Sequence, residues 1–502
     1  MSRKKKLLLN TGTALLYQVI TLACGFVLPK FIIPHFGSAV NGLLSSITQF
    51  LTIVTLCECG VGAVVQSALY KPLAEKDDDG ISKIIISANH FFNRVVCLLI
   101  GYVLILCIVY PIIVRNEFTY LYTVTLIGIM AASYFAQHYL YLALRLLLNA
   151  DQASFIQLGA HSLVLIINTV LTILLIKLGA PVHVVKLGSV VAFLIQPFAV
   201  RLYVNKHYNL NLKLQLREEP LKQKWNGLAQ HIASVVQGNT ATVVLTIFST
   251  LENISIYSVY YLVAHGIRQI ILSLNTGVQA MLGNMLAKRE METLDKTFTT
   301  VEFLFHALVT LLFGITGILL IPFVKIYTAN FTDADYIQPL FSALMVIGQA
   351  AYCLRIPFEM MVKAAGHYKQ TQTSSIIEAV LNIVTAVVLV LTLGMEGVAI
   401  SSIVAMGYRT VYLVFYMQKN ILNRPVKYFM KHLLVDAICV AAMLLATGWI
   451  KINPANYIEW ALSAVVVVLI CGCVCGAINF VFYKSEIGSA AKLLLRRKKK
   501  QA

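Results

Sequence analysis

The side chains that could do chemistry in this chain are charged and amide groups set inside long apolar segments. Arg268 lies near the middle of the apolar segment 254–285. A guanidinium keeps its charge in apolar surroundings and can donate paired hydrogen bonds to a phosphate. Because an arginine at the centre of a bilayer costs at least about 2.5 kcal/mol, its presence needs a reason. The sequence predicts an anion-binding group at Arg268, with a structural ion pair to Glu58 as the alternative.

Three more arginines are weaker candidates for the same anion-binding role. Arg355 precedes Glu359 and Lys363 at intervals of four residues, so the three side chains share a helical face and neutralise one another. Arg94 and Arg409 lie in apolar segments, and the alternative for both is that their side chains extend to the lipid headgroups.

Two acidic residues, Glu58 and Glu378, also lie inside apolar segments. Polar groups at such positions tend to face a bundle interior or a water-filled cavity. Both are candidates for ion coupling or for pairing with one of the arginines.

Amide and hydroxyl side chains form a stripe in two of the apolar segments. Helical spacing places Asn10 and Gln18 on one face of the first segment, and the seventh segment repeats the pattern with Gln230 and Gln237. These stripes predict the lining of a polar cavity, which would suit a sugar chain. Hydrogen bonding between helices is the alternative.

No catalytic motif accompanies these residues. The sequence holds no phosphate-binding loop, no His-Glu-x-x-His and no nucleophile elbow. Helical geometry turns Cys473 away from Cys471 and Cys475, so the three thiols cannot converge on one metal ion. We therefore expect a protein that is not an enzyme and that has no cofactor or metal.

The composition shows which elements must position these residues. Hydrophobic residues make up 59% of the 502 and charged residues only 12%, against about 25% charged in a soluble domain. Only helices or closed barrels satisfy their backbone groups within a bilayer, and apolar runs of about twenty residues indicate helices. We predict an all-α polytopic membrane protein with about fourteen transmembrane helices, at 7–33, 40–70, 91–114, 118–144, 155–176, 182–204, 225–248, 254–285, 301–326, 337–361, 374–393, 398–417, 433–450 and 458–483.

The basic residues predict the orientation of these helices. Fourteen spans place both termini on one side of the membrane, and most of the 40 basic residues then fall on that side. Basic loops stay in the cytoplasm, so both termini are predicted to be cytoplasmic. The net charge of +18 follows from this asymmetry and from contact with anionic lipid headgroups, and it does not indicate nucleic-acid binding.

A weak internal repeat predicts two bundles. Gly60-Val61-Gly62-Ala63 recurs as Gly277-Val278-Gln279-Ala280, near the ends of the second and eighth segments. Because six segments separate the two copies, the repeat is parallel. The predicted parts are an N-terminal six-helix bundle at 1–205, a cytoplasmic linker at 206–224, a C-terminal six-helix bundle at 225–418, helices thirteen and fourteen within 432–484, and a basic cytoplasmic tail at 485–502.

Short glycine-led motifs along nearly the whole chain resemble a known family. They are Phe36-Gly37-x4-Gly42, Gly60-Val61-Gly62-Ala63, Ala364-Ala365-Gly366-His367-Tyr368-Lys369 and Gly394-Met395-Glu396-Gly397-Val398-Ala399-Ile400. In order and spacing they resemble the Wzx-type oligosaccharide-lipid flippases, the polysaccharide-transporter branch of the superfamily that also contains the MATE exporters.

The resemblance implies two six-helix bundles around a central cavity that opens alternately to either side of a bacterial plasma membrane. It also implies the cargo, an undecaprenyl-pyrophosphate-linked oligosaccharide that is moved to the outer leaflet for capsule or O-antigen-like polysaccharide. Membrane lipids and other polysaccharide assembly proteins would be the partners. A MATE-like ion-coupled exporter of small molecules is the first alternative, and a membrane-embedded polysaccharide polymerase or assembly scaffold is the second.

Overall fold

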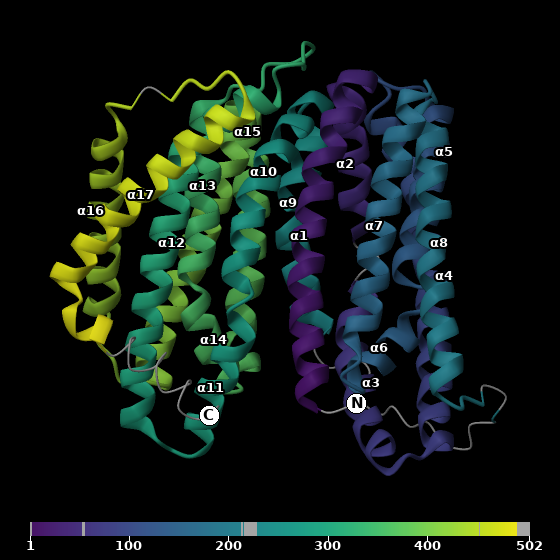
Figure 1. Ribbon diagram of the computed structural model, residues 1–502, viewed down its shortest axis with the longest axis horizontal. Coiled ribbons are helices and arrows are strands. Elements are labelled where there is room, and N and C mark those ends of the chain that lie inside the picture. The colour runs from purple at the N-terminus through teal and green to yellow at the C-terminus, as the bar shows by residue number, and fades with distance from the viewer. Residues whose placement is uncertain (1–2, 53–55, 212–213, 215–227, 451, 489–502) are drawn as a thin grey trace. The chain divides into compact units, whose positions relative to one another are not determined.

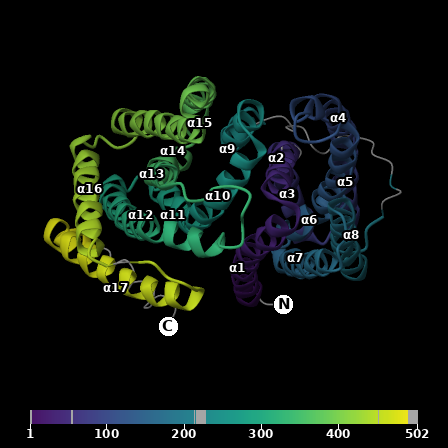
Figure 2. The same ribbon diagram turned by 90° about the horizontal axis from the view of Figure 1, so that it is seen from above.

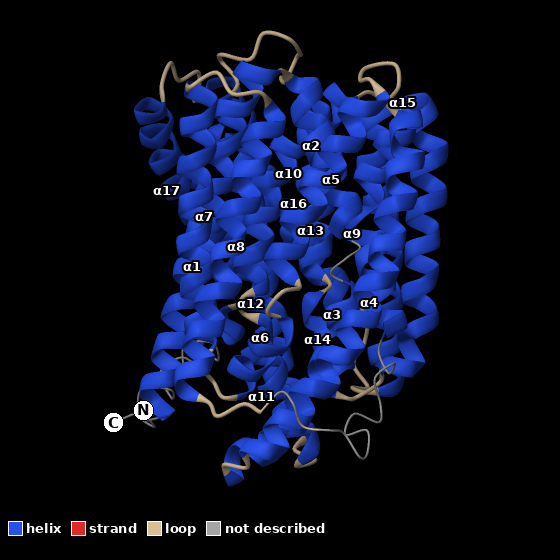
Figure 3. Ribbon diagram, turned by 90° about the vertical axis from the view of Figure 1, so that its right-hand side faces the viewer, coloured by secondary structure: helices blue, strands red, loops and turns tan. Residues whose placement is uncertain are grey.

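All regular structure in the described part of the chain is helical (Figure 3). The computed structural model describes residues 3–52, 56–211, 214, 228–450 and 452–488. Within its helices, the side chains of 3–4, 7, 56–61, 63, 228–237, 276–277 and 280 lie outside the description. The chain divides into two compact units, Met1–Ser255 and Ile256–Ala502.

The first unit contains nine labelled helices (Figure 1). The longest, α4, begins at Asp78, where the Asp77 carboxylate caps the helix by accepting a hydrogen bond from the Gly80 backbone N–H. The helices are α1 (Arg3–Phe36), α2 (Ser38–Thr52), α3 (Leu56–Glu75), α4 (Asp78–Ile113), α5 (Tyr120–His138), α6 (Leu142–Ala150), α7 (Ser154–Lys177), α8 (Val182–His207) and α9 (Leu228–Phe248).

The second unit contains the remaining helices, and α10 crosses the division between the units. They are α10 (Leu251–Leu272), α11 (Asn275–Ala287), α12 (Met291–Tyr327), α13 (Pro339–Leu354), α14 (Ile356–Ala364), α15 (Tyr368–Asn420), α16 (Lys427–Thr447) and α17 (Tyr457–Phe482). The 37 residues of α12, at 1.5 Å each, exceed the roughly 30 Å of bilayer hydrocarbon.

The structure supports a multi-pass membrane protein. Within the described ranges, nine helical segments are long and apolar enough to cross a membrane. They overlap ten of the fourteen predicted spans, because α15 holds both 374–393 and 398–417. Of the other four, 118–144 corresponds to α5 and the start of α6, and 254–285 to α10 and α11, whereas 40–70 and 225–248 include residues outside the description.

Two local breaks explain differences between the predicted spans and the helices. In α15, Gly394 has φ 59° and ψ −131°, a conformation that residues with a Cβ rarely adopt. The helix reverses there, so the Asn382 side chain accepts a hydrogen bond from Ser401 on the returning limb. The predicted span 337–361 is divided at Arg355 into α13 and α14, because Pro357 lacks the N–H that would continue the helix.

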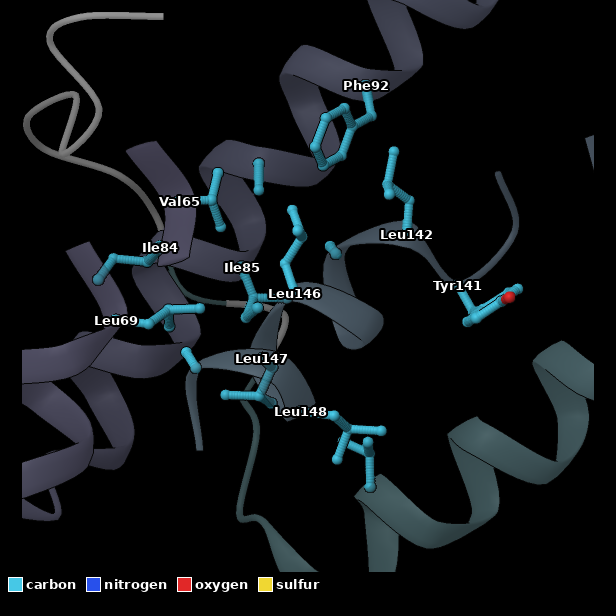
Figure 4. Close-up of a cluster of buried hydrophobic side chains, with 14 of the residues drawn as sticks. Val65, Leu69, Ile84, Ile85, Phe92, Tyr141, Leu142, Leu146, Leu147 and Leu148 are labelled. Carbon is cyan, nitrogen blue, oxygen red and sulfur yellow. The ribbon is translucent and has the colours of Figure 1, made fainter. Parts of the chain in front are cut away.

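The first unit has a hydrophobic core around the short helix α6. Leu146, Leu147 and Leu148 are buried there against α3 and α4, which contribute Val65 and Ile85 (Figure 4). This core fixes the turn between α6 and α7, which the N-terminal part of α1 contacts through polar side chains.

In the second unit, α16 and α17 lie side by side and both contact α12 (Figures 1 and 2). Phe303 of α12 packs with Cys439 and Met443 of α16 and with Cys471 and Cys475 of α17. Cys473 is exposed, as the helical spacing of the three thiols predicts. The last two helices are therefore attached to the second unit through α12.

Candidate functional site

Arg268 of α10 is held by aromatic and imidazole neighbours. Its Nη2 atom donates a hydrogen bond of 3.2 Å to the Tyr261 hydroxyl and lies 2.6 Å from His265 Nδ1. The Gln269 side-chain amide nitrogen lies 2.8 Å from the other ring nitrogen of His265. From α13, the Tyr352 ring lies 4.8 Å from the Arg268 guanidinium carbon, within the range of a cation–π contact. Four neighbours therefore orient this guanidinium directly or through His265.

The positive charge of Arg268 has no acidic partner among the described residues. The Arg268 Nε atom is buried and makes no hydrogen bond to any described residue. The side chain as a whole is partly exposed. A positioned, partly exposed guanidinium without an ion pair can bind an anionic oxygen through charge-assisted hydrogen bonds.

Arg355 and Arg268 both contact the Tyr352 ring, but the charge of Arg355 is neutralised by acidic residues. Its guanidinium carbon lies 4.3 Å from the centroid of Tyr352, so Tyr352 contacts both arginines. Arg355 is 4% exposed and donates a hydrogen bond to Glu378 of α15. Its Nε atom also lies 3.8 Å from a Glu359 carboxylate oxygen. Removing either acid would leave a buried charge with less compensation.

Glu359 and Lys363 complete a chain of charges along α14. The Lys363 ammonium lies 2.8 Å from Glu359, so the mutual neutralisation predicted from the four-residue spacing is confirmed. Arg355 and Lys363 therefore share this carboxylate.

Arg409 reaches the same acidic residue, Glu378, from the returning limb of α15. Its Nε atom lies 3.7 Å from Glu378 Oε2, and it donates hydrogen bonds to the Thr371 carbonyl and the Ser374 hydroxyl. Arg409 is buried. Its side chain therefore does not extend to the lipid headgroups, the alternative interpretation of this residue. Glu378 thus pairs with two arginines.

We call these six residues the cationic cluster: Arg268, Arg355, Glu359, Lys363, Glu378 and Arg409. Basic side chains outnumber acidic ones by two, and Arg268 is the basic member without an ion pair in the described structure. The arrangement favours binding of an anion at Arg268 and a structural role for the paired members.

Sequence reasoning missed the two tyrosines that contact Arg268. The spacing contained a signal for them. Tyr261 precedes Arg268 by seven residues and Tyr352 precedes Arg355 by three, intervals that place side chains on one helical face. An aromatic residue at such a distance from an intramembrane arginine is a recognisable cation–π pattern.

Three other predicted site residues lie in the first unit. Asn10 bonds the turn between α6 and α7, because its amide donates to the Gln152 carbonyl and accepts from the Phe155 N–H, both at 2.9 Å. Gln18 is partly exposed on α1, and Arg94 is exposed on α4. The structure does not bring Asn10 and Arg94 into one hydrogen-bonded group.

The remaining predicted residues, Glu58, Gln230 and Gln237, have side chains outside the described part of the structure. Among the residues that are described, no three His, Cys, Asp or Glu side chains are grouped to hold a metal ion. The candidate site is therefore an electrostatic one, centred on Arg268.

Comparison with solved structures identifies the fold. A structure described as lipid II flippase MurJ in an inward-closed conformation matches with a TM-score of 0.69 and 17% identity, covering 96% of this chain and all of that one. An inward-facing multidrug-resistance MATE transporter of the MOP superfamily matches with a TM-score of 0.58 and 14% identity, over 80% of this chain and 95% of that one.

An outward-facing MATE transporter of the same superfamily matches with a TM-score of 0.56 and 11% identity, over 84% of this chain and 96% of that one. No family model and no curated protein matches the sequence. At these identities the likeness shows that the chain has the fold of the MurJ and MATE structures.

Proposed function

We propose that this protein is a flippase of the Wzx type, which moves an undecaprenyl-pyrophosphate-linked oligosaccharide from the cytoplasmic to the outer leaflet of a bacterial plasma membrane. The glycan would supply a capsule or an O-antigen-like polysaccharide. The protein would be a transporter with no catalytic step of its own. The observation that carries the proposal is Arg268, a positioned intramembrane guanidinium with no ion pair in the described structure.

The fold supports a transport role. Its likeness to a structure named as a lipid II flippase extends over 96% of the chain. Related folds are recorded in inward-facing and outward-facing conformations. Exchange between two such conformations is the simplest way for this chain to move a headgroup across the bilayer.

The charge of the cationic cluster supports an anionic cargo. Desolvation strengthens the attraction between a guanidinium and a pyrophosphate because the local dielectric constant is low. The acids of the cluster already engage Arg355, Arg409 and Lys363, which leaves Arg268 for the substrate. Binding of the pyrophosphate would neutralise part of the charge of Arg268. It would thereby lower the free-energy barrier to the change from the inward-facing to the outward-facing conformation.

The proposal includes the predicted layout. Fourteen spans would form two parallel six-helix bundles followed by two further helices, with both termini in the cytoplasm. Amides of the first and seventh spans, among them Gln18, Gln230 and Gln237, would contact the sugar, and the polyprenyl tail would remain in lipid. Membrane lipids and polysaccharide assembly proteins would be its interaction partners.

An ion-coupled exporter of small molecules is the second candidate, favoured by the likeness to MATE transporters. The excess of basic over acidic groups around Arg268 disfavours a cationic cargo. An anionic small molecule would satisfy the same site, so the two candidates differ in whether the cargo is joined to a lipid.

Complementation in cells tests the proposal. A strain lacking its own oligosaccharide-lipid flippase would receive the wild type, Arg268→Ala or Arg268→Lys, at matched membrane levels. We expect Arg268→Ala to abolish surface polysaccharide and to trap lipid-linked precursor in the inner leaflet. Arg268→Lys should restore export only in part, because an ammonium cannot form the paired hydrogen bonds of a guanidinium.

The matched control is Arg201→Ala, which removes an exposed arginine from α8 and should export normally. Normal export by Arg268→Ala would make Arg268 structural and would remove the observation on which the proposal stands. Loss of export without trapped precursor would point to a cargo that is not lipid-linked.

A further inference from the structure

A second group of buried charges lies apart from the cationic cluster, where α12 meets α16. It consists of Glu302 and His306 on α12, Arg424 in the segment before α16, and His432 and Asp436 on α16. Glu302 is 1% exposed and His306 is 2% exposed. We call this group the α12–α16 cluster.

The α12–α16 cluster contains two linked pairs. Glu302 Oε2 lies 2.7 Å from Arg424 Nη2 and 3.7 Å from His432 Nε2. His306 Nδ1 lies 2.5 Å from Asp436 Oδ2. The two imidazole rings stack with their centroids 4.7 Å apart, which joins the pairs into one group.

The fixed charges of this cluster do not balance. Glu302 is neutralised by Arg424, while the Asp436 carboxylate contacts the His306 imidazole and accepts a hydrogen bond of 2.8 Å from the Thr310 hydroxyl. With both histidines neutral, one negative charge is uncompensated. Asp436 is partly buried, with 16% of its side chain exposed, and a charge removed from water without a charged partner is costly.

The surroundings supply no further cation to Asp436 in the described structure. The Lys431 ammonium instead donates to the Phe482 carbonyl at 3.1 Å and lies 4.5 Å from the centroid of the Tyr483 ring. On α14, Phe358 is the side chain that packs towards this region, through Phe298 and Phe429. The other titratable groups nearby are Asp295 on α12, Tyr428, Cys439, Cys475 and Tyr483 on or beside α16 and α17, and Glu486.

Both imidazoles also have buried nitrogen atoms that are not hydrogen-bonded. His306 Nε2 and His432 Nδ1 have no partner among the described residues. Such atoms are rare in folded proteins and call for an explanation. His306 Nε2, on the ring whose Nδ1 contacts Asp436, is therefore a place where one proton could bind.

We propose that the α12–α16 cluster is a binding site for one proton, carried by His306 beside Asp436. The proton comes from hydronium in the solvent and adds to Nε2 of the His306 imidazole, and the resulting imidazolium donates its Nδ1–H to the Asp436 carboxylate. The cluster is then neutral, and α16 is fastened to α12 by an ion pair. When the proton leaves, the partly buried negative charge of Asp436 favours separation of α16 from α12.

Proton linkage in the purified full-length protein tests this site without any transport assay. Thermal unfolding midpoints would be measured in detergent between pH 5.5 and 8.5 for the wild type, Asp436→Asn and His306→Gln. A proton held only by the folded state changes the folding equilibrium up to tenfold per pH unit. The wild type should lose stability as the pH rises, relative to either variant.

Asp436→Asn removes the uncompensated charge, so it should fold and should be relatively more stable than the wild type at high pH. Glu292→Gln is the matched control, because Glu292 is an exposed acid on α12, the helix of His306, and it should keep the wild-type pH dependence. Equal pH dependence in the wild type and Asp436→Asn would overturn the proposal. So would a wild-type midpoint that responds to sodium concentration at fixed pH and fixed ionic strength.

A second measurement uses only wild-type protein and so does not depend on the variants folding. Cys439 is buried on α16, one turn from Asp436, whereas Cys473 of α17 is exposed. Labelling by N-ethylmaleimide would be quantified at each thiol by mass spectrometry. The ratio of Cys439 to Cys473 labelling should rise several-fold from pH 6 to pH 8, and an unchanged ratio would count against proton-controlled attachment of α16.

Discussion

At the scale of single residues, intramembrane polar groups divide by whether their partners are already present. Asn10 uses both ends of its amide on the turn between α6 and α7, and Arg355 is enclosed by Glu359, Glu378 and the Tyr352 ring. Arg268 has aromatic and imidazole neighbours but no acid in the described structure. The first two therefore support the fold, and Arg268 is the residue for which we propose a ligand.

Neutralising the shared acid of the cationic cluster should destabilise the protein. Glu378→Gln would leave Arg355 and Arg409 without their common partner, and loss of one partner of a buried pair costs about 3–5 kcal/mol. We expect a clear fall in the thermal unfolding midpoint of the purified protein. Arg268→Ala should leave the midpoint nearly unchanged, and a larger fall for Arg268→Ala than for Glu378→Gln would reverse these assignments.

Removing the amide of Asn10 should loosen the turn between α6 and α7. Gln152 in this turn has φ 57°, and Asn10 bonds the backbone on either side of the turn. Asn10→Ala should cost about 1–3 kcal/mol, because two backbone groups lose their partners. Proteolysis or hydrogen exchange at residues 151–155 would reveal faster opening, and unaltered exchange there would show that other contacts hold the turn.

At the scale of helices, hydropathy predicts where a helix forms better than where it breaks. The segments 301–326 and 458–483 correspond to the continuous helices α12 and α17, because a long apolar run admits no other structure in lipid. The interruptions at Arg355 and at Gly394 depend on single residues. Pro357 in the sequence indicates the interruption at Arg355, and Gly394, which lies between two predicted spans, is consistent with the other interruption.

The candidate site was predictable only in part for a related reason. The apolar context singled out Arg268, and the spacing of Arg355, Glu359 and Lys363 predicted their pairing. The contact of Glu378 with both Arg355 and Arg409 depends on how α14 and the two limbs of α15 pack. Contacts between residues distant in sequence are not contained in helical periodicity, which also explains why the α12–α16 cluster went unpredicted.

The reversal within α15 should depend on the glycine at its apex. Gly394→Ala would force a Cβ into a backbone conformation that costs on the order of 1–3 kcal/mol for residues other than glycine. We expect lower expression and a lower unfolding midpoint. Gly407→Ala is the control, since Gly407 lies within the same helix and a Cβ there would meet open space. Equal behaviour of the two variants would contradict a conformational requirement at Gly394.

At the scale of the whole molecule, the chain has the fold of the MurJ and MATE structures. It divides into two compact units, and helices long enough to cross a membrane occur in both. The charge asymmetry predicts an orientation, with both termini in the cytoplasm, that the fold alone does not give. Reporter fusions would test it. Alkaline phosphatase should be active when fused after Asp333 and inactive when fused after Arg289, because these positions flank α12 and are predicted to lie on opposite faces. The reverse pattern would place both termini outside.

The most direct measurement of the central claim is translocation by purified protein in liposomes. A fluorescent polyprenyl-pyrophosphate oligosaccharide would be followed by its accessibility to a membrane-impermeant quencher, with the wild type, Arg268→Ala and Arg201→Ala in separate vesicles. The account predicts rapid exchange between leaflets with the wild type and Arg201→Ala, and a rate at least tenfold lower with Arg268→Ala. Equal rates with wild-type and Arg268→Ala vesicles, or no exchange above protein-free vesicles, would contradict it.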